Sequence, residues 1–216
     1  MPTEVSQYRP VRSPIGLPQV DPVSLVPRPD PFDDPDWVFE PKYDGIRGFV
    51  YASHNGCEIR CRRDFRFDRF GDLCERIARV LRDREVILDG EVVSLDRQGK
   101  PNFRELVRGQ GYLAFAASDL VWLDGRDLRQ LPLDERKRLL AELLPQDTGP
   151  LYKILTLDEC GRALFGAIRK MDLAGVVAKR RQDPYGAGTT WQQITNPTYT
   201  QGERRVNLLR RRERTR

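Results

Sequence analysis

Short runs of apolar residues, alternating with polar ones or clustered, fill most of the chain between its proline-rich start and its arginine-rich end. Runs of about four to eight such residues, bounded by turn residues, are typical of β-strands. We expect strands at seven places: 37–43, 47–53, 57–62, 85–96, 112–125, 174–180 and 191–196. The triplets "DGI" (44–46) and "HNG" (54–56) separate the first three runs, and both are good hairpin signals.

Other segments place apolar residues at helical spacing or carry helix-terminus signals, and they are 72–83, 102–109, 131–144 and 156–171. The second ends at Gly109, and the third has Pro132 near its start. In the fourth, Thr156 and Glu159 have capping-box spacing, so we expect a helix to begin there. Because hairpins and helices are mixed along the chain, the order predicts an α+β fold with mainly antiparallel sheets flanked by helices.

The chain divides into three parts by composition. Residues 1–36 hold nine prolines and little periodicity, which predicts an extended leader draped over the body or tethered to it. Whether this leader docks on the body is left open. Residues 37–197 form the predicted body, and 198–216 form a basic tail.

Composition narrows the class of protein. At 216 residues, with 39% hydrophobic and 32% charged residues, the chain can bury a substantial core. Its apolar runs are too short to span a bilayer, and its start lacks the apolar segment of a secretory signal, so we expect a cytoplasmic protein. Cys57 and Cys61 have neither a second cysteine pair nor a histidine cluster beside them, which favours buried or half-buried thiols over a zinc site.

The net charge of +5 is unevenly placed. Residues 202–216 carry seven arginines against two glutamates, so the rest of the chain is formally neutral. Such a tail is typical either of a solvated helix end or of an electrostatic anchor on nucleic-acid phosphates.

One lysine raises a question of chemistry. Lys42 is followed closely by Asp44 and Arg47, and this arrangement suits a surface hairpin or a covalent nucleophile. A nucleophilic lysine reacts as the neutral amine, and attack on a phosphate also needs cations and carboxylates nearby. Arg62, Arg63, Glu91 and Lys179 supply such groups from other predicted elements.

These residues occur in stretches that resemble the adenylation (nucleotidyltransferase) domain of ATP-dependent DNA ligases, especially the bacterial repair-type group. "EPKYDGIR" matches the nucleophile motif K-x-D-G-x-R, "LDGEVV" matches the third motif, and "DLAGVVAKR" resembles the fourth. "SDLVWLDGRDLRQLPLDERKRLL" follows the family's F-D-L-L-x-L-D-G-x-D-L stretch, and "TTWQQITNPTYTQGE" resembles the last motif. The resemblance covers about residues 20–203 and favours this family over capping enzymes and RNA ligases, which share K-x-D-G.

The resemblance implies roles for individual residues. Lys42 would attack ATP to form a lysyl-AMP intermediate, within a catalytic group of Lys42, Asp44 and Arg47. The residues implied to bind the nucleotide are Glu40 at the adenine amine, Arg62 near ribose and phosphate, Glu91 at a ribose hydroxyl, Phe115 near the base and Lys179 at the pocket edge. The cofactors implied are ATP and Mg²⁺ or Mn²⁺, and the partner is nicked DNA, bound through the tail and the Arg62–Arg63 region.

Four positions depart from the family's pattern. Ala174 replaces a metal-site glutamate, and Ser118 replaces the aromatic residue that stacks on adenine, with Phe115 three residues away. Gln193 and Thr195 replace the two lysines of the last motif. A lost charge-assisted contact to phosphate costs about 1.5 to 3 kcal/mol, so slow chemistry is expected.

Two interpretations follow. The first is an ATP-dependent DNA ligase-type nucleotidyltransferase that acts in strand-break repair or recombination, slow or dependent on a partner. The second is a catalytically inactive ligase-like module that binds ATP, AMP or nucleic acid. The 20 residues after Asn196 are too few for the OB-fold domain that usually follows in this family, so we expect a separate chain or the tail to take over its contacts.

Overall fold

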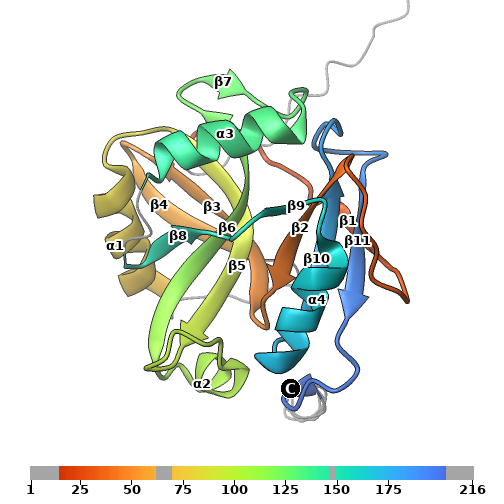
Figure 1. The fold of residues 1–216 in the computed structure, drawn as a ribbon. Coiled ribbons are helices and arrows are strands. Elements are labelled where there is room, and N and C mark those ends of the chain that lie inside the picture. Colours follow the sequence, from red (N-terminus) through yellow and green to blue (C-terminus); the bar gives the residue numbers. More distant parts are fainter. Residues whose placement is uncertain (1–14, 62–69, 146–148, 203–216) are drawn as a thin grey trace, which may run out of the picture.

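The computed structural model describes residues 15–61, 70–145 and 149–202. These residues form two β-sheets with helices on their outer faces (Figure 1). The larger sheet has the order β4-β3-β5-β6-β7, with β8 paired to β6. Its strands are β3 (Ile46–Ser53), β4 (Gly56–Cys61), β5 (Val86–Leu95), β6 (Tyr112–Leu123), β7 (Arg126–Asp127) and β8 (Leu151–Lys153).

The smaller sheet has the order β1-β11-β10-β2-β9. Its strands are β1 (Ser24–Pro27), β2 (Trp37–Lys42), β9 (Leu157–Asp158), β10 (Gly175–Arg180) and β11 (Thr190–Thr195). Pairing is antiparallel except between β1 and β11 and between β6 and β8. The predicted α+β fold with mainly antiparallel sheets is therefore confirmed.

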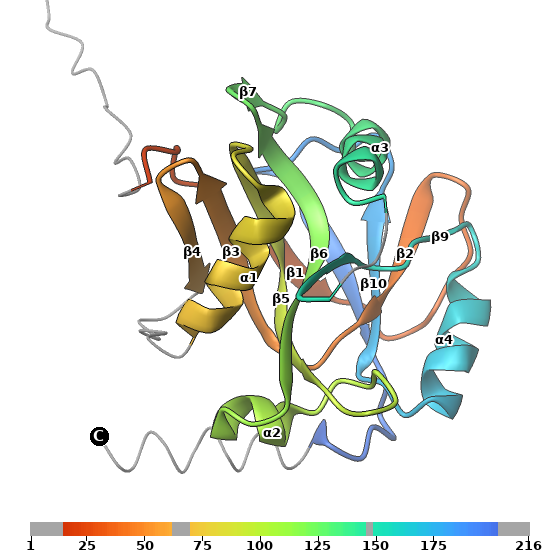
Figure 2. The ribbon, with the colours of Figure 1, turned by 90° about the vertical axis from the view of Figure 1, so that its left-hand side faces the viewer.

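Four helices cover these sheets within the described residues: α1 (Gly71–Leu81), α2 (Phe103–Arg108), α3 (Leu133–Leu143) and α4 (Gly161–Lys170). In α1, Leu73 and Ile77 are completely buried and join the core of the larger sheet. In α4, Leu164 and Ile168 pack on the smaller sheet. Figure 2 shows α1 lying across β3 and β4, with α4 on the far side beside β2 and β10. No helix among these four is long and apolar enough to cross a membrane.

A third cluster of buried residues joins the two sheets. Phe49 and Ile87 of the larger sheet meet Trp191 of the smaller one there. Residues of the proline-rich leader complete this cluster, and they are Ile15, Leu17, Val20 and Val23. The leader therefore docks on the body over its described part, and β1 adds a strand beside β11 that its prolines gave no reason to expect.

The predicted hairpin at 44–46 is wrong. The strand before it, β2, pairs with β10, whereas the strand after it, β3, pairs with β4 and β5. The turn thus carries the chain from one sheet to the other, and it passes so close to β5 that a Cβ on Gly45 would lie 2.3 Å from the Val92 carbonyl oxygen. The predicted hairpin at 54–56 is confirmed, because Ser53 pairs with Gly56.

The predicted start of the last helix is also wrong. Leu157 and Asp158 pair with β2 as the short strand β9, and α4 begins at Gly161. The Thr156 hydroxyl donates to the Ile154 carbonyl at 3.5 Å, so it caps no helix. Strand pairing outside the local sequence overrides the capping-box signal here. The end of α2 is as predicted, with Gly109 in the left-handed conformation (φ 68°).

Candidate active site between the two sheets

A pocket of about 190 Å³ opens between the two sheets. It is lined by Leu25, Glu40, Pro41, Lys42, Tyr43, Arg47, Asp89, Gly90, Glu91, Ser118, Ile154, Val177, Trp191 and Gln193. Four of the residues predicted for the site, Glu40, Lys42, Arg47 and Glu91, therefore meet in one cavity although they come from three strands. Arg62 and the arginines of the tail lie outside the described residues.

Strand register brings the motif residues of the smaller sheet side by side. Gln193 of β11 and Glu40 of β2 both pair with Val177 of β10. Two residues further along, Thr195 and Lys42 both pair with Gly175. These two rows lie on the same face of the sheet, and they hold the lysine, the buried carboxylate and both positions where the family's lysines are replaced.

Arg47 forms the opposite wall of the pocket. Its guanidinium donates to Asp89 through two hydrogen bonds, of 3.1 and 2.7 Å, and to the Val23 carbonyl at 2.7 Å. It also lies 4.9 Å from the centre of the Trp191 ring. Burial opposes the charge on Arg47, but Asp89 outweighs it and raises the pKa of the guanidinium. Asp89, in turn, accepts a hydrogen bond from the Tyr185 hydroxyl at 2.7 Å.

Glu40 lies at the base of the pocket with lysines on both sides. Its carboxylate forms ion pairs with Lys137 of α3 and, at 2.9 Å, with Lys179 of β10. Burial alone would raise the pKa of Glu40, but the two lysines lower it below its usual value. The Ser118 hydroxyl donates to the same carboxylate at 3.0 Å and accepts from Lys179.

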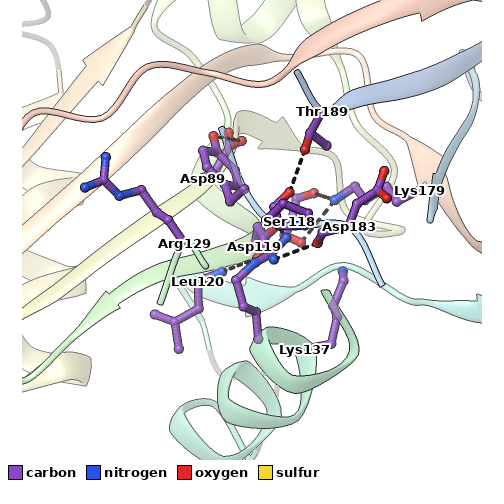
Figure 3. Close-up of polar contacts among 12 residues, drawn as sticks. Asp89, Ser118, Asp119, Leu120, Arg129, Lys137, Lys179, Asp183 and Thr189 are labelled. Carbon is purple, nitrogen blue, oxygen red and sulfur yellow. Dashed lines mark hydrogen bonds and ion pairs between the residues drawn. The ribbon is translucent and has the colours of Figure 1, made fainter. Parts of the chain in front are cut away.

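Lys179 is fully buried, and its ammonium lies 3.8 Å from the centre of the Trp191 ring. Burial lowers the pKa of Lys179 to about 8, and the ion pair with Glu40 offsets this only in part. Figure 3 shows Ser118 and Lys179 close together, with Lys137 reaching toward them from α3. The neighbouring Arg136 fixes that helix, because it donates to Asp119 of β6 through two bonds of 2.9 Å.

The turn between the sheets is held on both sides. The carboxylate of Glu91 accepts a hydrogen bond from the Gly45 N–H at 3.1 Å. Asp44 is buried and accepts from the Tyr199 hydroxyl at 2.9 Å. Asp44 therefore secures the turn that presents Lys42, and it is not among the residues that line the pocket.

Phe115 is not brought to the pocket. It pairs with Val92 on β5 and is completely buried in the core on the other face of the larger sheet. The strand has a register shift between Asp89 and Gly90, where Ser118 has no direct partner. This irregularity turns Ser118 toward the pocket, so the residue at the family's aromatic position faces the site and its neighbouring phenylalanine does not.

The position of Ala174 offers no carboxylate for a metal ion. The nearby Asp172 is engaged elsewhere, by Lys100 at 3.2 Å and by the backbone and hydroxyl of Thr200. Over residues 15–61, 70–145 and 149–202, no group of three or more His, Cys, Asp or Glu side chains is arranged to hold a metal ion. The described side chains therefore do not fit a preformed metal site.

Sequence reasoning missed Asp89 and Trp191, which line the pocket, and Lys137, which contacts the pocket residue Glu40. Asp89 precedes the recognised Gly90-Glu91 pair, and Trp191 opens the last motif, so motif proximity was the available signal for both. Lys137 lies 97 residues from Glu40, and nothing in the local sequence indicates that the two side chains meet.

Comparison with known proteins identifies the family of the chain. The family model described as "ATP dependent DNA ligase domain" matches residues 30–194. The chain is 36% identical over 154 residues to the multifunctional non-homologous end joining DNA repair protein LigD of Mycobacterium tuberculosis, which covers 70% of this chain and 20% of that protein. It is 25% identical over 195 residues to the SPbeta prophage-derived DNA ligase-like protein LigB of Bacillus subtilis, covering 84% of this chain and 69% of that one.

Among solved structures, mycobacterial DNA ligase D complexed with ATP and MES matches with a TM-score of 0.69 and 31% identity, over 81% of this chain and 60% of that one. The chain spans about a fifth of the length of the LigD proteins that it matches. The family model matches most of the sequence, and a solved ligase structure has the same fold. The chain therefore belongs to the ATP-dependent DNA ligase family, of which it is an adenylation (nucleotidyltransferase) domain.

Proposed function

We propose that this chain binds ATP in the pocket between the sheets and transfers AMP to Lys42, the first step of DNA strand-break sealing. The observation that carries the proposal is the convergence of Lys42, Arg47 and Glu91 on one pocket. Surface charges on a hairpin, the alternative interpretation of this stretch, would have no reason to share a cavity with Glu91.

The transfer step is a substitution at the α-phosphorus of ATP. The neutral amine of Lys42 attacks, a phosphorus–nitrogen bond forms, the bond to pyrophosphate breaks, and the amine releases a proton to solvent. Glu91, beside the turn that carries Lys42, is suited to accept a hydrogen bond from a ribose hydroxyl. Arg47 supplies positive charge to the same wall, fixed by Asp89.

The part of the site where the adenine base would bind differs from the pattern that the family implies. Ser118 replaces a stacking ring, and Glu40, the residue implied for the adenine amine, already accepts from Lys137, Lys179 and Ser118. We therefore expect weak binding of the nucleotide base. Mg²⁺ or Mn²⁺ enters the proposal only as an ion supplied with ATP, since the described side chains provide no carboxylate cluster for it.

Action on nicked DNA rests on the arginines of residues 204–216 and on Arg62 and Arg63, none of which is among the described residues. Deletion of residues 204–216 should weaken duplex binding and flatten its dependence on salt, because each arginine–phosphate contact releases counterions. Unchanged binding would exclude the tail as the DNA anchor. DNA repair together with a partner protein, and a cytoplasmic location, belong to the same proposal.

Self-adenylation tests the proposal directly. Purified protein is incubated with ATP labelled at the α-phosphate and Mg²⁺ or Mn²⁺, beside Lys42→Ala and the control Lys170→Ala, whose lysine is exposed on α4. We expect an acid-labile covalent label on the parent and the control, and none on Lys42→Ala.

A second candidate function is nucleotide binding without chemistry, and the loss of charge at Ala174, Gln193 and Thr195 favours it. A folded protein that gains no label with either metal, but whose melting temperature rises with ATP, would support this function and overturn the first.

A further inference from the structure

The segment that follows β11, residues 196–202, crosses the end of a neighbouring strand in the smaller sheet. Asn196 starts it and is buried. Its backbone N–H donates to the Ala174 carbonyl, and its side-chain amide donates to the Leu173 carbonyl, both at 2.9 Å. In Figure 1 and Figure 2 the segment lies at the same end of the molecule as α2. It therefore passes from β11 across the start of β10, toward the end of β2 that carries Lys42.

The far end of this segment is bonded to connections of both sheets. The backbone N–H and the hydroxyl of Thr200 donate to the Asp172 carboxylate at 2.9 and 2.7 Å, and Lys100 donates to the same carboxylate at 3.2 Å. Burial opposes the charge on Asp172, but the bonds from Thr200 and Lys100 outweigh it and lower the pKa of the carboxyl. The side-chain amide of Gln201 donates to the Pro101 carbonyl at 3.4 Å. Because Asp172 precedes β10 and Pro101 follows β5, the segment is tied to both sheets.

Between these attachments, Tyr199 reaches the turn that joins the sheets. Its hydroxyl donates to the carboxylate of Asp44 at 2.9 Å, and Asp44 is only 2% exposed. The next residue of the turn, Gly45, donates its N–H to Glu91 at 3.1 Å. Side chains from two distant parts of the chain thus hold two consecutive residues of the turn. The bond from Tyr199 adds a fixed point two residues after Lys42.

Building on the proposed function, on which this inference rests, we propose that Tyr199 is a positioning residue for the adenylation of Lys42. Tyr199 is not among the residues that line the pocket, so it does not act by touching the nucleotide. It acts through Asp44, because the hydrogen bond holds the turn, and the turn sets the direction in which β2 presents the lysine. Attack on the α-phosphorus needs the amine in line with the leaving pyrophosphate, and small displacements lower the rate steeply.

Tyr199→Phe tests this role, because it keeps the ring and removes only the hydroxyl. The rate of label incorporation is measured over a range of concentrations of α-labelled ATP. We expect the maximal rate to fall about 10-fold, as the loss of a hydrogen bond to a carboxylate predicts. The ATP concentration that gives half the maximal rate should stay within about twofold of the parent's, since no contact to the nucleotide is removed.

Thr200→Val is the matched control from the same segment. It also removes a hydroxyl that donates to a carboxylate, but this carboxylate, Asp172, belongs to the connection before β10 and not to the turn. The backbone N–H of Thr200 still binds Asp172, so the segment keeps its place. Thr200→Val should therefore keep the parent's rate, and thermal melting should show both variants folded at the assay temperature. An equal loss of rate in both variants would mean that Tyr199 only stabilises the segment, and would overturn the proposal.

Hydrogen exchange measures the turn itself, independently of the chemistry. The backbone N–H of Gly45 is bonded to Glu91, and Tyr199→Phe should make its exchange about 5- to 10-fold faster, whereas Thr200→Val should not. Unchanged exchange at Gly45 in Tyr199→Phe would overturn the proposal. Label on the parent with a parent-like rate for Tyr199→Phe would overturn it too, and would leave the proposed function standing. No label on the parent would overturn the proposed function and this inference with it, even if exchange at Gly45 rose.

Discussion

Arg47 and Asp89 lie diagonally across the pairing of β3 with β5, and two hydrogen bonds, of 3.1 and 2.7 Å, join them in a forked contact. Glu91, the direct partner of Arg47 in the register, lies on the same face of the sheet. The wall of the pocket thus presents one cation and two carboxylates at fixed positions. One of these carboxylates, Asp89, is committed to holding the cation.

Asp89→Asn should destabilise the protein by about 1.5 to 3 kcal/mol, because it removes the charge from a buried acceptor of the Arg47 guanidinium. Urea unfolding measures this free energy. Asp127→Asn is the matched control, since the Asp127–Arg129 pair is solvent-exposed and should contribute less than about 1 kcal/mol. Equal losses in the two variants would mean that the Arg47–Asp89 contact contributes no more than a surface pair.

Gly45→Ala tests the crossing between the sheets. A Cβ there would lie 2.3 Å from the Val92 carbonyl oxygen and 2.8 Å from the Glu91 side chain, so the turn must shift. We expect a loss of unfolding free energy of about 1 to 3 kcal/mol and weaker ATP binding, since overpacking displaces the backbone beside Lys42. Thermal melting with and without ATP checks both.

Gly166→Ala is the control for this substitution. Gly166 lies inside α4 with open space around its Cβ position, so alanine should stabilise the helix by about 0.5 to 1 kcal/mol. A melting temperature of Gly45→Ala at or above that of the parent would show that the close approach at the turn is not a constraint.

Lys179 should make stability depend on pH on the alkaline side. Its pKa is lowered by burial to about 8 in the folded protein, below the usual 10.5. Between these values the unfolded chain binds more protons than the folded one, so the free energy of unfolding rises with pH. The rise between about pH 7 and 9.5 should be of the order of 2 kcal/mol.

Lys179→Met isolates this contribution. The variant keeps the ion pair between Glu40 and Lys137, and it keeps all other groups that titrate in this range. Urea unfolding of both proteins over the same pH range should give a difference that grows with pH in favour of the parent. A difference that stays constant would mean that Lys179 titrates near its usual pKa.

Much of the fold follows from local patterns, and the exceptions have physical causes. The apolar spacing of Leu73 and Ile77 fixes the buried face of α1 without reference to other elements. The turn at Gly45 failed as a hairpin signal because the same triplet suits a tight bend between sheets. The strand β9 replaced a predicted helix start because pairing with β2, more than 100 residues earlier in the chain, decides its conformation.

The candidate site likewise has residues that the sequence predicts and contacts that it does not. Motif spacing sufficed for Lys42, Arg47 and Glu91, which share the pocket. Side-chain alternation places Phe115 in the core opposite Val92, whereas the irregular register beside Ser118 is invisible in the sequence. Contacts such as Lys137 with Glu40 depend on how α3 lies on the sheet, and no local signal carries that information.

The pocket also indicates which substitution should restore a missing positive charge. Gln193 lines the pocket in the same row as Glu40, at the position of a lysine in the family's last motif. Its amide donates to Thr195 at 3.3 Å, so it brings no positive charge to a bound phosphate. Gln193→Lys should therefore restore a charge-assisted contact of about 1.5 to 3 kcal/mol and speed adenylation of Lys42 by roughly 10- to 100-fold. The initial rate of label incorporation from α-labelled ATP measures the gain.

Gln182→Lys adds the same charge at an exposed position and should leave the rate unchanged. If both variants react at the parent's rate while binding ATP as it does, the missing charge at Gln193 does not limit the chemistry, and the defect lies at Ala174 or Thr195.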